Sequence, residues 1–162
     1  MSSTNRLCSI RIDDSDLPAP SPEVSQERKV AIFDLLENNR FELADRDGQK
    51  MQEGPYSLVI SIWDGRLVFD VGSSDGTTIV KFYLSLAPMR QTMKDYFAIC
   101  SSYYNAVKKL PRAQIETVDM ARRGIHNEGA RSLRRRLKGK IDVDTATAKR
   151  LFTLVCALQP RR

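Results

Sequence analysis

Residues 56–71 read YSLVISIWDGRLVFDV, and this stretch decides the kind of fold that the chain can adopt. Apolar positions alternate up to Trp63, which is the two-residue period of a strand with one buried face. Asp64-Gly65 then supplies the two residues with positive φ that a tight hairpin needs. The alternation resumes at Leu67, so we expect an antiparallel hairpin.

The strands on either side extend this hairpin into a meander. A second turn, SSDG at residues 73–76, leads into a third strand. That strand carries its apolar side chains at Ile79, Val80, Phe82 and Leu84. A further short strand is expected around Arg40 to Asp45. Consecutive strands joined by short turns favour an antiparallel sheet.

A strand and a helix are expected before the meander. Arg6 to Ile12 alternates as a short strand. Ser21 followed by Pro22 is typical of a helix start, since serine caps the N-terminus and proline is tolerated at the first position. We expect this helix to reach Asn38. Its predicted buried face comprises Val30, Ile32, Phe33, Leu35 and Leu36.

Three helices are expected after the meander. The first runs from Pro88 to Leu110 with apolar residues at Met89, Met93, Tyr96, Phe97, Cys100, Tyr103, Tyr104 and Val107. The second opens at Pro111, ends at Gly139 and has a stripe of Ile115, Val118, Ala121, Ile125, Leu133 and Leu137. Asp142 or Asp144 caps the last, which carries Ala148, Leu151, Phe152, Val155 and Leu158. The order predicts an α+β fold: an antiparallel β-meander of three to five strands with four helices packed on it.

Length and composition indicate one domain over residues 1–162, with residues 1–5 and 160–162 flexible. The 162 residues are 41% hydrophobic and 28% charged, which is typical of a globular chain. No apolar run approaches the roughly 20 residues of a membrane span, and the N-terminus lacks the pattern of a secretory signal. Cys8, Cys100 and Cys156 each lie in an apolar context, so we expect buried, reduced cysteines and a cytoplasmic protein.

The positive charge is concentrated in one segment. Arg122 to Lys140 contains eight basic residues and one acid, Glu128, for a net charge of +7, so the rest of the chain is close to neutral within the total of +6. Arg131, Arg134, Arg135 and Lys138 share one face of a helix. Such a face favours an anionic partner such as RNA, a ribonucleoprotein or an acidic protein, although charge runs are also common as solvated helix faces.

His126 is the only histidine, and it lies in the sequence RRGIHNEG at residues 122–129. In a helix Arg122 and His126 lie on one face with Arg123 and Asn127 beside them, whereas Glu128 pairs with His126 only if the backbone breaks. Gly124 and Gly129 favour such a break. The segment is then a candidate anion site at a turn between helices. The alternative is a structural histidine, bonded to a carbonyl or to Glu128, where glycines permit close helix packing.

The aromatic residues and the possible metal- or cofactor-binding patterns say less about the function. Tyr96, Phe97, Tyr103 and Tyr104 have the spacing of core residues, and nucleobase stacking is the alternative. One histidine and scattered cysteines predict no metal site, and the glycine patterns of phosphate and dinucleotide sites are absent, so no cofactor is expected.

Several strings together resemble the bacterial uncharacterised protein family 0262. These are RKVAIFDL at residues 28–35, KDYF at 94–97, SYY at 102–104, DMARRGIHNEG at 119–129, KIDVD at 140–144 and RLFTLVC at 150–156. The resemblance extends from about Leu7 to Leu158. It implies a bacterial cytoplasmic protein and supplies no assigned activity and no catalytic residues.

Three hypotheses follow for the function. The first is a small binding or regulatory module whose basic helical face, Arg122 to Lys140, engages an anionic partner. The second is a protein-interaction adaptor or homodimer that uses the helices Pro88 to Leu110 and Pro111 to Lys138. The third is an enzyme that acts on a phosphorylated small molecule through His126. The sequence favours a binding protein over an enzyme.

Overall fold

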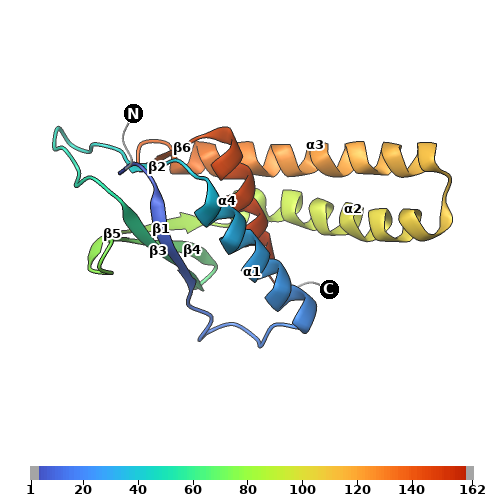
Figure 1. Ribbon diagram of the computed structural model, residues 1–162, viewed down its shortest axis with the longest axis horizontal. Helices are drawn as coiled ribbons and strands as arrows, with labels where there is room; N and C mark the ends of the chain where they lie inside the picture. Colours follow the sequence, from blue (N-terminus) through green and yellow to red (C-terminus); the bar gives the residue numbers. More distant parts are fainter. Residues whose placement is uncertain (1–3, 160–162) are drawn as a thin grey trace.

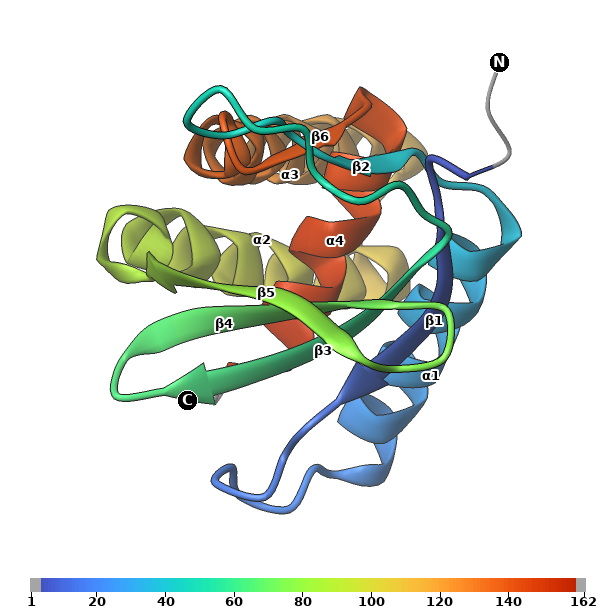
Figure 2. The same cartoon turned by 90° about the vertical axis from the view of Figure 1, so that its left-hand side faces the viewer.

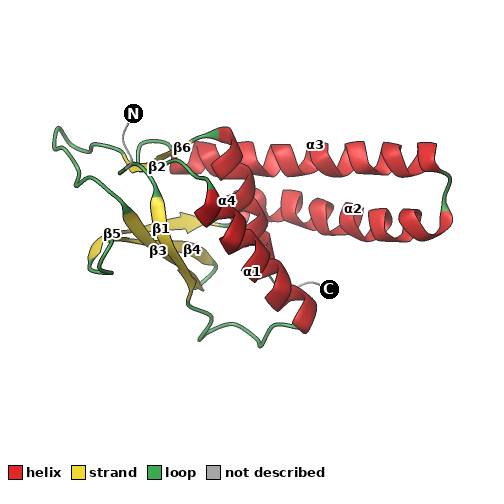
Figure 3. Ribbon diagram, viewed as in Figure 1, coloured by secondary structure: helices red, strands yellow, loops and turns green. Residues whose placement is uncertain are grey.

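The computed structural model describes residues 4–159 and has an α+β architecture (Figures 1 and 3). Its central meander is β3 (Tyr56–Trp63), β4 (Arg66–Ser73) and β5 (Thr78–Ser85), paired antiparallel as predicted. Asp64 and Gly65 have φ values of 52° and 72° at the β3–β4 turn, which confirms the predicted hairpin. The inward positions of β3 and β4 are buried, apart from Ile62 near the end of β3, which is half-buried.

The first strand pairs differently from the rest of the sheet. β1 (Leu7–Ile12) lies parallel to β3, so the four-stranded sheet has the order β1-β3-β4-β5 with one parallel pair. A parallel neighbour requires a long connection, and α1 (Pro22–Glu37) lies in that connection. The side chain of Asn39 fastens α1 to β1, because it accepts from the Leu7 N–H (2.7 Å) and donates to the Leu7 and Leu35 carbonyls.

A second small sheet joins segments about 100 residues apart. β2 (Phe41–Leu43) lies within the strand predicted around residues 40–45, but it pairs antiparallel with β6 (Ile141–Val143) instead of the meander. The sequence analysis missed β6. Phe41 and Val143 are buried opposite each other, so this pair closes the end of the core near the start of the last helix.

The helices lie together on one side of the sheet (Figure 2). After a short 3₁₀ turn at Ala87–Met89, α2 (Arg90–Lys109) and α3 (Arg112–Leu137) form a long hairpin that projects from the body (Figure 1). α4 (Thr145–Ala157) contacts both α1 and α3 and is buried along most of its length. The predicted caps are confirmed, since Ser21 accepts from the Val24 N–H and Asp144 accepts from the Thr147 N–H.

The predicted buried face of α1 is partly wrong. Val30, Phe33 and Leu36 are exposed, whereas Arg28, Ala31 and Leu35 face the core. Arg28 tolerates this position because its Nε donates to the Ala157 carbonyl (3.1 Å) and its guanidinium approaches Asp14. The contact satisfies a carbonyl of the last turn of α4 and turns α1 away from the face that its apolar residues suggest.

Two further burial predictions need correction. Ala121 is exposed, because the outer half of α3 packs mainly against α2. Of the three cysteines only Cys156 is buried, while Cys8 and Cys100 are half-buried, and none of the three forms a disulfide within the described residues. The predicted flexible residues 1–3 and 160–162 lie outside the described part of the chain. Asn5 is described, and its carbonyl accepts from the Phe41 N–H.

Candidate functional site

The predicted helix break around His126 is wrong. α3 is one continuous helix from Arg112 to Leu137, with Gly124 and Gly129 inside it. Each glycine lowers helix propensity by about 1 kcal/mol, but packing against α2 and α4 outweighs this local cost. Gly129 has a packing role, because a Cβ there would overlap the ring of Phe152. Gly124 has no such neighbour, since a Cβ there meets nothing within 4 Å.

The imidazole of His126 is packed between helices. Its Nε2 lies 2.7 Å from Thr153 Oγ1 of α4, and its ring contacts those of Tyr96 and Phe152 at centroid distances of 5.3 and 5.5 Å. The Thr153 hydroxyl donates to the Lys149 carbonyl, so it accepts from the Nε2–H of His126. Burial, reinforced by the charges of Lys149 and Arg122, lowers the pKa of His126. A neutral imidazole bonded to a hydroxyl in this way holds α3 against α4.

The two arginines beside His126 share one carboxylate. Arg122 Nη2 lies 2.6 Å from Asp119 Oδ1, and Arg123 Nε lies 3.2 Å from Asp119 Oδ2. The Arg122 guanidinium also stacks over Tyr103 at 4.9 Å from the ring centroid. Asp119 therefore offsets part of the charge that the sequence assigned to an anion site.

Glu128 and Asn127 do not join His126 either. Glu128 Oε2 accepts from Arg131 Nη2 at 2.8 Å, and its other oxygen lies 4.0 Å from Arg135. The hydrogen bond from Arg131 lowers the pKa of Glu128. Asn127 is half-buried. The structure thus divides the predicted site into a packed part around His126 and a basic part that begins at Arg131.

The basic part lies at the end of α3 and just beyond it, and we call it the basic segment. It comprises Arg131, Arg134, Arg135, Arg136, Lys138 and Lys140. The first five are exposed, while Leu133 and Leu137 between them are fully buried on the opposite side of the helix. Arg134 Nη1 donates to Thr145 Oγ1 at 3.1 Å, which ties the segment to the start of α4. The segment therefore has a fixed backbone and solvent-facing cations.

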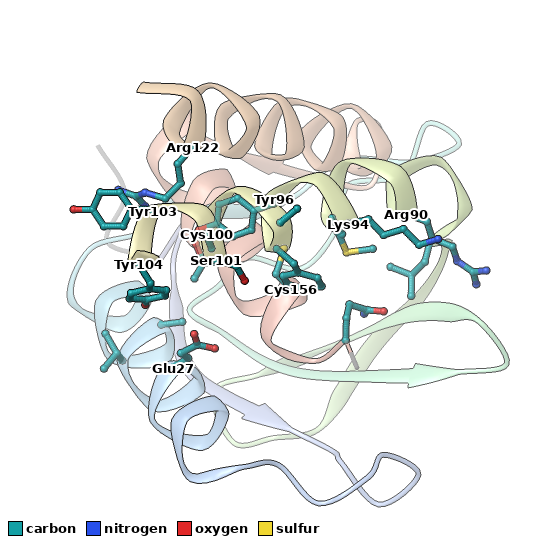
Figure 4. A pocket seen from close by; sticks show the side chains of 18 of the residues that line it. Glu27, Arg90, Lys94, Tyr96, Cys100, Ser101, Tyr103, Tyr104, Arg122 and Cys156 are labelled. Carbon is teal, nitrogen blue, oxygen red and sulfur yellow. The ribbon is translucent and has the colours of Figure 1, made fainter. Parts of the chain in front are cut away.

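The structure has a groove between α1 and α2 that the sequence analysis did not predict. Its volume is about 1360 Å³, and α1, α2 and α4 form its walls (Figure 4). Tyr96, Cys100 and Cys156 line its interior, and Arg122 and Tyr103 lie at one end (Figure 4). Burial raises the pKa of Tyr96, so this hydroxyl stays protonated. The walls come from segments about 60 residues apart, so spacing along the chain gave no signal of the groove.

The aromatic residues that were predicted as core, with base stacking as the alternative, differ in how far they are buried. Tyr96 and Phe97 pack against the hydrophobic core, while Tyr103 is half-buried beneath Arg122. Tyr104 is 64% exposed. No cation–π pair among the described residues joins Tyr96, Tyr103 or Tyr104 to the basic segment.

Neither a metal-ligand cluster nor a membrane-spanning helix occurs among the described residues. No group of three or more His, Cys, Asp or Glu side chains in residues 4–159 is arranged to hold a metal ion. None of the helices in the same range has the length and apolarity to cross a bilayer.

The fold and these surfaces define a small α+β protein with an exposed basic helix end and an open apolar groove. The chain belongs to the uncharacterised protein family UPF0262, which it matches over residues 4–161. A UPF0262 protein of Paracoccus denitrificans is 61% identical over 158 residues, covering 98% of both chains. A relative from Ruegeria pomeroyi is 60% identical over 154 residues, covering 95% of this chain and 96% of its own. No solved structure matches.

Proposed function

We propose that the protein binds RNA through the basic segment. The observation that carries this proposal is the exposure of five cations, four on the last turns of α3 and Lys138 just after it, while Leu133 and Leu137 on the other side of the helix are fully buried. Among residues 4–159, Glu128 is the one acid that forms an ion pair with this segment, and its partners there are Arg131 and Arg135. Arg134, Arg136 and Lys138 keep their charge available for phosphate groups.

The charge exceeds what helix stability requires. Cations in the last turn of a helix favour its C-terminus, where the aligned peptide dipoles are equivalent to about half a negative charge. The last turn of α3 alone contains Arg134, Arg135 and Arg136, and Lys138 and Lys140 follow. A surplus of this size at one place produces a local positive field that attracts polyanions.

The choice of arginine supports a phosphate backbone as the partner. Four of the six cations are arginines, whose planar guanidinium groups bind phosphate with two parallel hydrogen bonds. We place this activity in the cytoplasm as part of the proposal, because none of the three cysteines forms a disulfide within the described residues, as a reducing compartment favours.

The test is fluorescence anisotropy with a labelled single-stranded RNA at several salt concentrations. Wild-type affinity should fall steeply with salt, since each phosphate contact contributes about 0.7 to the slope of log K against log salt. The triple variant R134E/R135E/R136E should lose most of the affinity and lower that slope by about 2.

A control with the same charge change separates a local site from net charge. K108E/K109E/R112E alters three exposed cations at the far end of the α2–α3 hairpin. It should retain at least half of the wild-type affinity. Equal losses in the two triple variants, or binding that ignores salt, would contradict the proposal. Binding to an acidic polypeptide with no binding to RNA would assign the basic segment to a protein partner instead.

A further inference from the structure

We propose that the groove between α1 and α2 is the interface of a symmetric homodimer. Its volume of about 1360 Å³ exceeds the roughly 300–1,000 Å³ typical of small-molecule sites. Its lining residues on α2 extend from Arg90 to Tyr104, which is about 21 Å at 1.5 Å per residue. An open groove of this length has the dimensions of an α-helix of about four turns.

The apolar residues of α2 have the spacing of a helix-pairing seam. Met93, Phe97, Cys100, Tyr104 and Val107 follow one another at intervals of four, three, four and three residues. This is the a and d pattern of a heptad repeat, in which side chains interlock with those of a second helix. We call these five residues the α2 seam.

Exposure increases along the α2 seam, from a buried first residue to two exposed residues at its end. Met93 is 3% exposed, whereas Tyr104 is 64% and Val107 is 51% exposed. Across the groove, α1 adds the exposed Val30. Apolar side chains left in water on facing helices favour association, because burying them removes apolar surface from solvent.

Charge at the groove indicates that the occupant is a second copy of this chain. Arg90 and Lys94 lie at one end of the groove, while Glu27 lies with Tyr104 towards the other (Figure 4). Asp34, also on the α1 wall, follows Glu27 by two helical turns. In the part of the chain that the structure describes, neither Asp34 nor Lys94 forms an ion pair.

A twofold axis makes these opposite charges complementary. An interface between identical copies requires that each contact occur twice, with the two residues exchanged between copies. When two α2 seams pack antiparallel, the basic end of one groove approaches the acidic α1 wall of the other, and the reverse contact forms by symmetry. Cys100 lies at the middle of the α2 seam, seven positions from Met93 and seven from Val107, so the axis passes near it and its counterpart.

The first experiment measures the mass of the full-length protein by light scattering and sedimentation velocity over a range of concentrations. Wild type should be a dimer, and Val107→Asp should raise its dissociation constant at least about tenfold. Met120→Asp is the matched control, because Met120 is 66% exposed on α3, outside both the α2 seam and the groove. A monomeric wild type at about 100 μM, or equal effects of the two variants, would overturn the proposal.

A charge exchange tests the symmetry of the interface. Asp34→Lys and Lys94→Glu each place like charges opposite each other, so each variant alone should dimerise at least about tenfold more weakly. Mixed together they should form a one-to-one heterodimer, because both contacts then join opposite charges. Failure of the mixture to recover the dimer mass would reject the antiparallel arrangement.

Cysteine crosslinking tests the position of the axis. A short bismaleimide should link two wild-type copies through Cys100. The crosslinked dimer should disappear in Cys100→Ser and persist in Cys8→Ser. A crosslink that survives Cys100→Ser would contradict the predicted axis. All these substitutions leave the basic segment intact, so their outcome is independent of RNA binding.

Discussion

The two glycines of α3 should respond in opposite directions to the same substitution. Gly124→Ala adds a methyl group where nothing lies within 4 Å and replaces a poor helix former with the best one. We expect a stabilisation of about 0.4–1 kcal/mol. The helix is continuous at this position, so the substitution introduces no change of backbone.

Gly129→Ala should destabilise the protein despite the same gain in helix propensity. The added Cβ overlaps the ring of Phe152, which is fully buried. That ring is held between Tyr96 and His126 at centroid distances of 5.9 and 5.5 Å, so it has little room to move. Overpacking of this kind costs about 1–3 kcal/mol, and we take the upper end because the ring is fixed. Subtracting about 1 kcal/mol of propensity leaves a net loss of about 2 kcal/mol.

Urea unfolding of the two variants beside wild type measures both effects. The two free energies of unfolding should differ by about 3 kcal/mol, and the melting temperatures by about 6–12 °C. The double variant G129A/F152L should be less destabilised than the sum of its single changes, because leucine makes room for the methyl group. Stabilisation by Gly129→Ala, or exact additivity with Phe152→Leu, would refute the packing argument.

Two further predictions concern single side chains that join distant elements. The pKa of His126 is lowered in the fold from an ordinary value of about 6.5, so the unfolded chain binds more protons and stability falls as the pH drops below that value. Because His126 is the only histidine, His126→Gln should flatten the change in the free energy of unfolding between about pH 7.5 and 5.5. If the free energy of unfolding of the variant still changes as much as that of wild type, the titration of His126 is not the cause. Asn39→Ala removes three hydrogen bonds to Leu7 and Leu35, so it should lower the free energy of unfolding by about 2 kcal/mol in the same urea assay. The control is Asn38→Ala at the neighbouring exposed position, which should change it by less than about 0.5 kcal/mol.

The features that the sequence predicted well depend on a few consecutive residues. The Asp64-Gly65 turn, the Ser21 cap and the end of α3 near Gly139 each follow from local backbone preferences. Gly139 has a φ of 83°, a conformation that favours glycine. These local preferences do not depend on the rest of the chain, so the predicted turn, cap and helix end are also present in the folded structure.

Local sequence patterns could not predict which distant strands pair with each other. β6 has three residues, and its partner β2 lies about 100 residues earlier. The parallel position of β1 likewise depends on where α1 places it beside β3. The periodicity of a strand predicts which side chains share a face, and it carries no information about the neighbour on either edge.

The same limit explains why the candidate site changed. The sequence analysis placed Arg122, Arg123 and His126 at a turn between helices, whereas they lie along one continuous helix. Their interactions there are decided by Asp119 and Thr153. Asp119 was within one helical turn of both arginines and was a signal that charge counting overlooked. Thr153 belongs to α4, so its bond to His126 required the tertiary structure.

The α2 seam shows what sequence and structure contribute together. The spacing from Met93 to Val107 marks one continuous apolar stripe, and such a stripe ordinarily indicates burial within the chain. In the fold Met93 is buried, whereas Tyr104 and Val107, nearer the C-terminal end of α2, are exposed. A stripe that starts in the core and continues into solvent is longer than the monomer needs. The excess length, beside an open groove with opposite charges, is the physical reason to expect a second helix there.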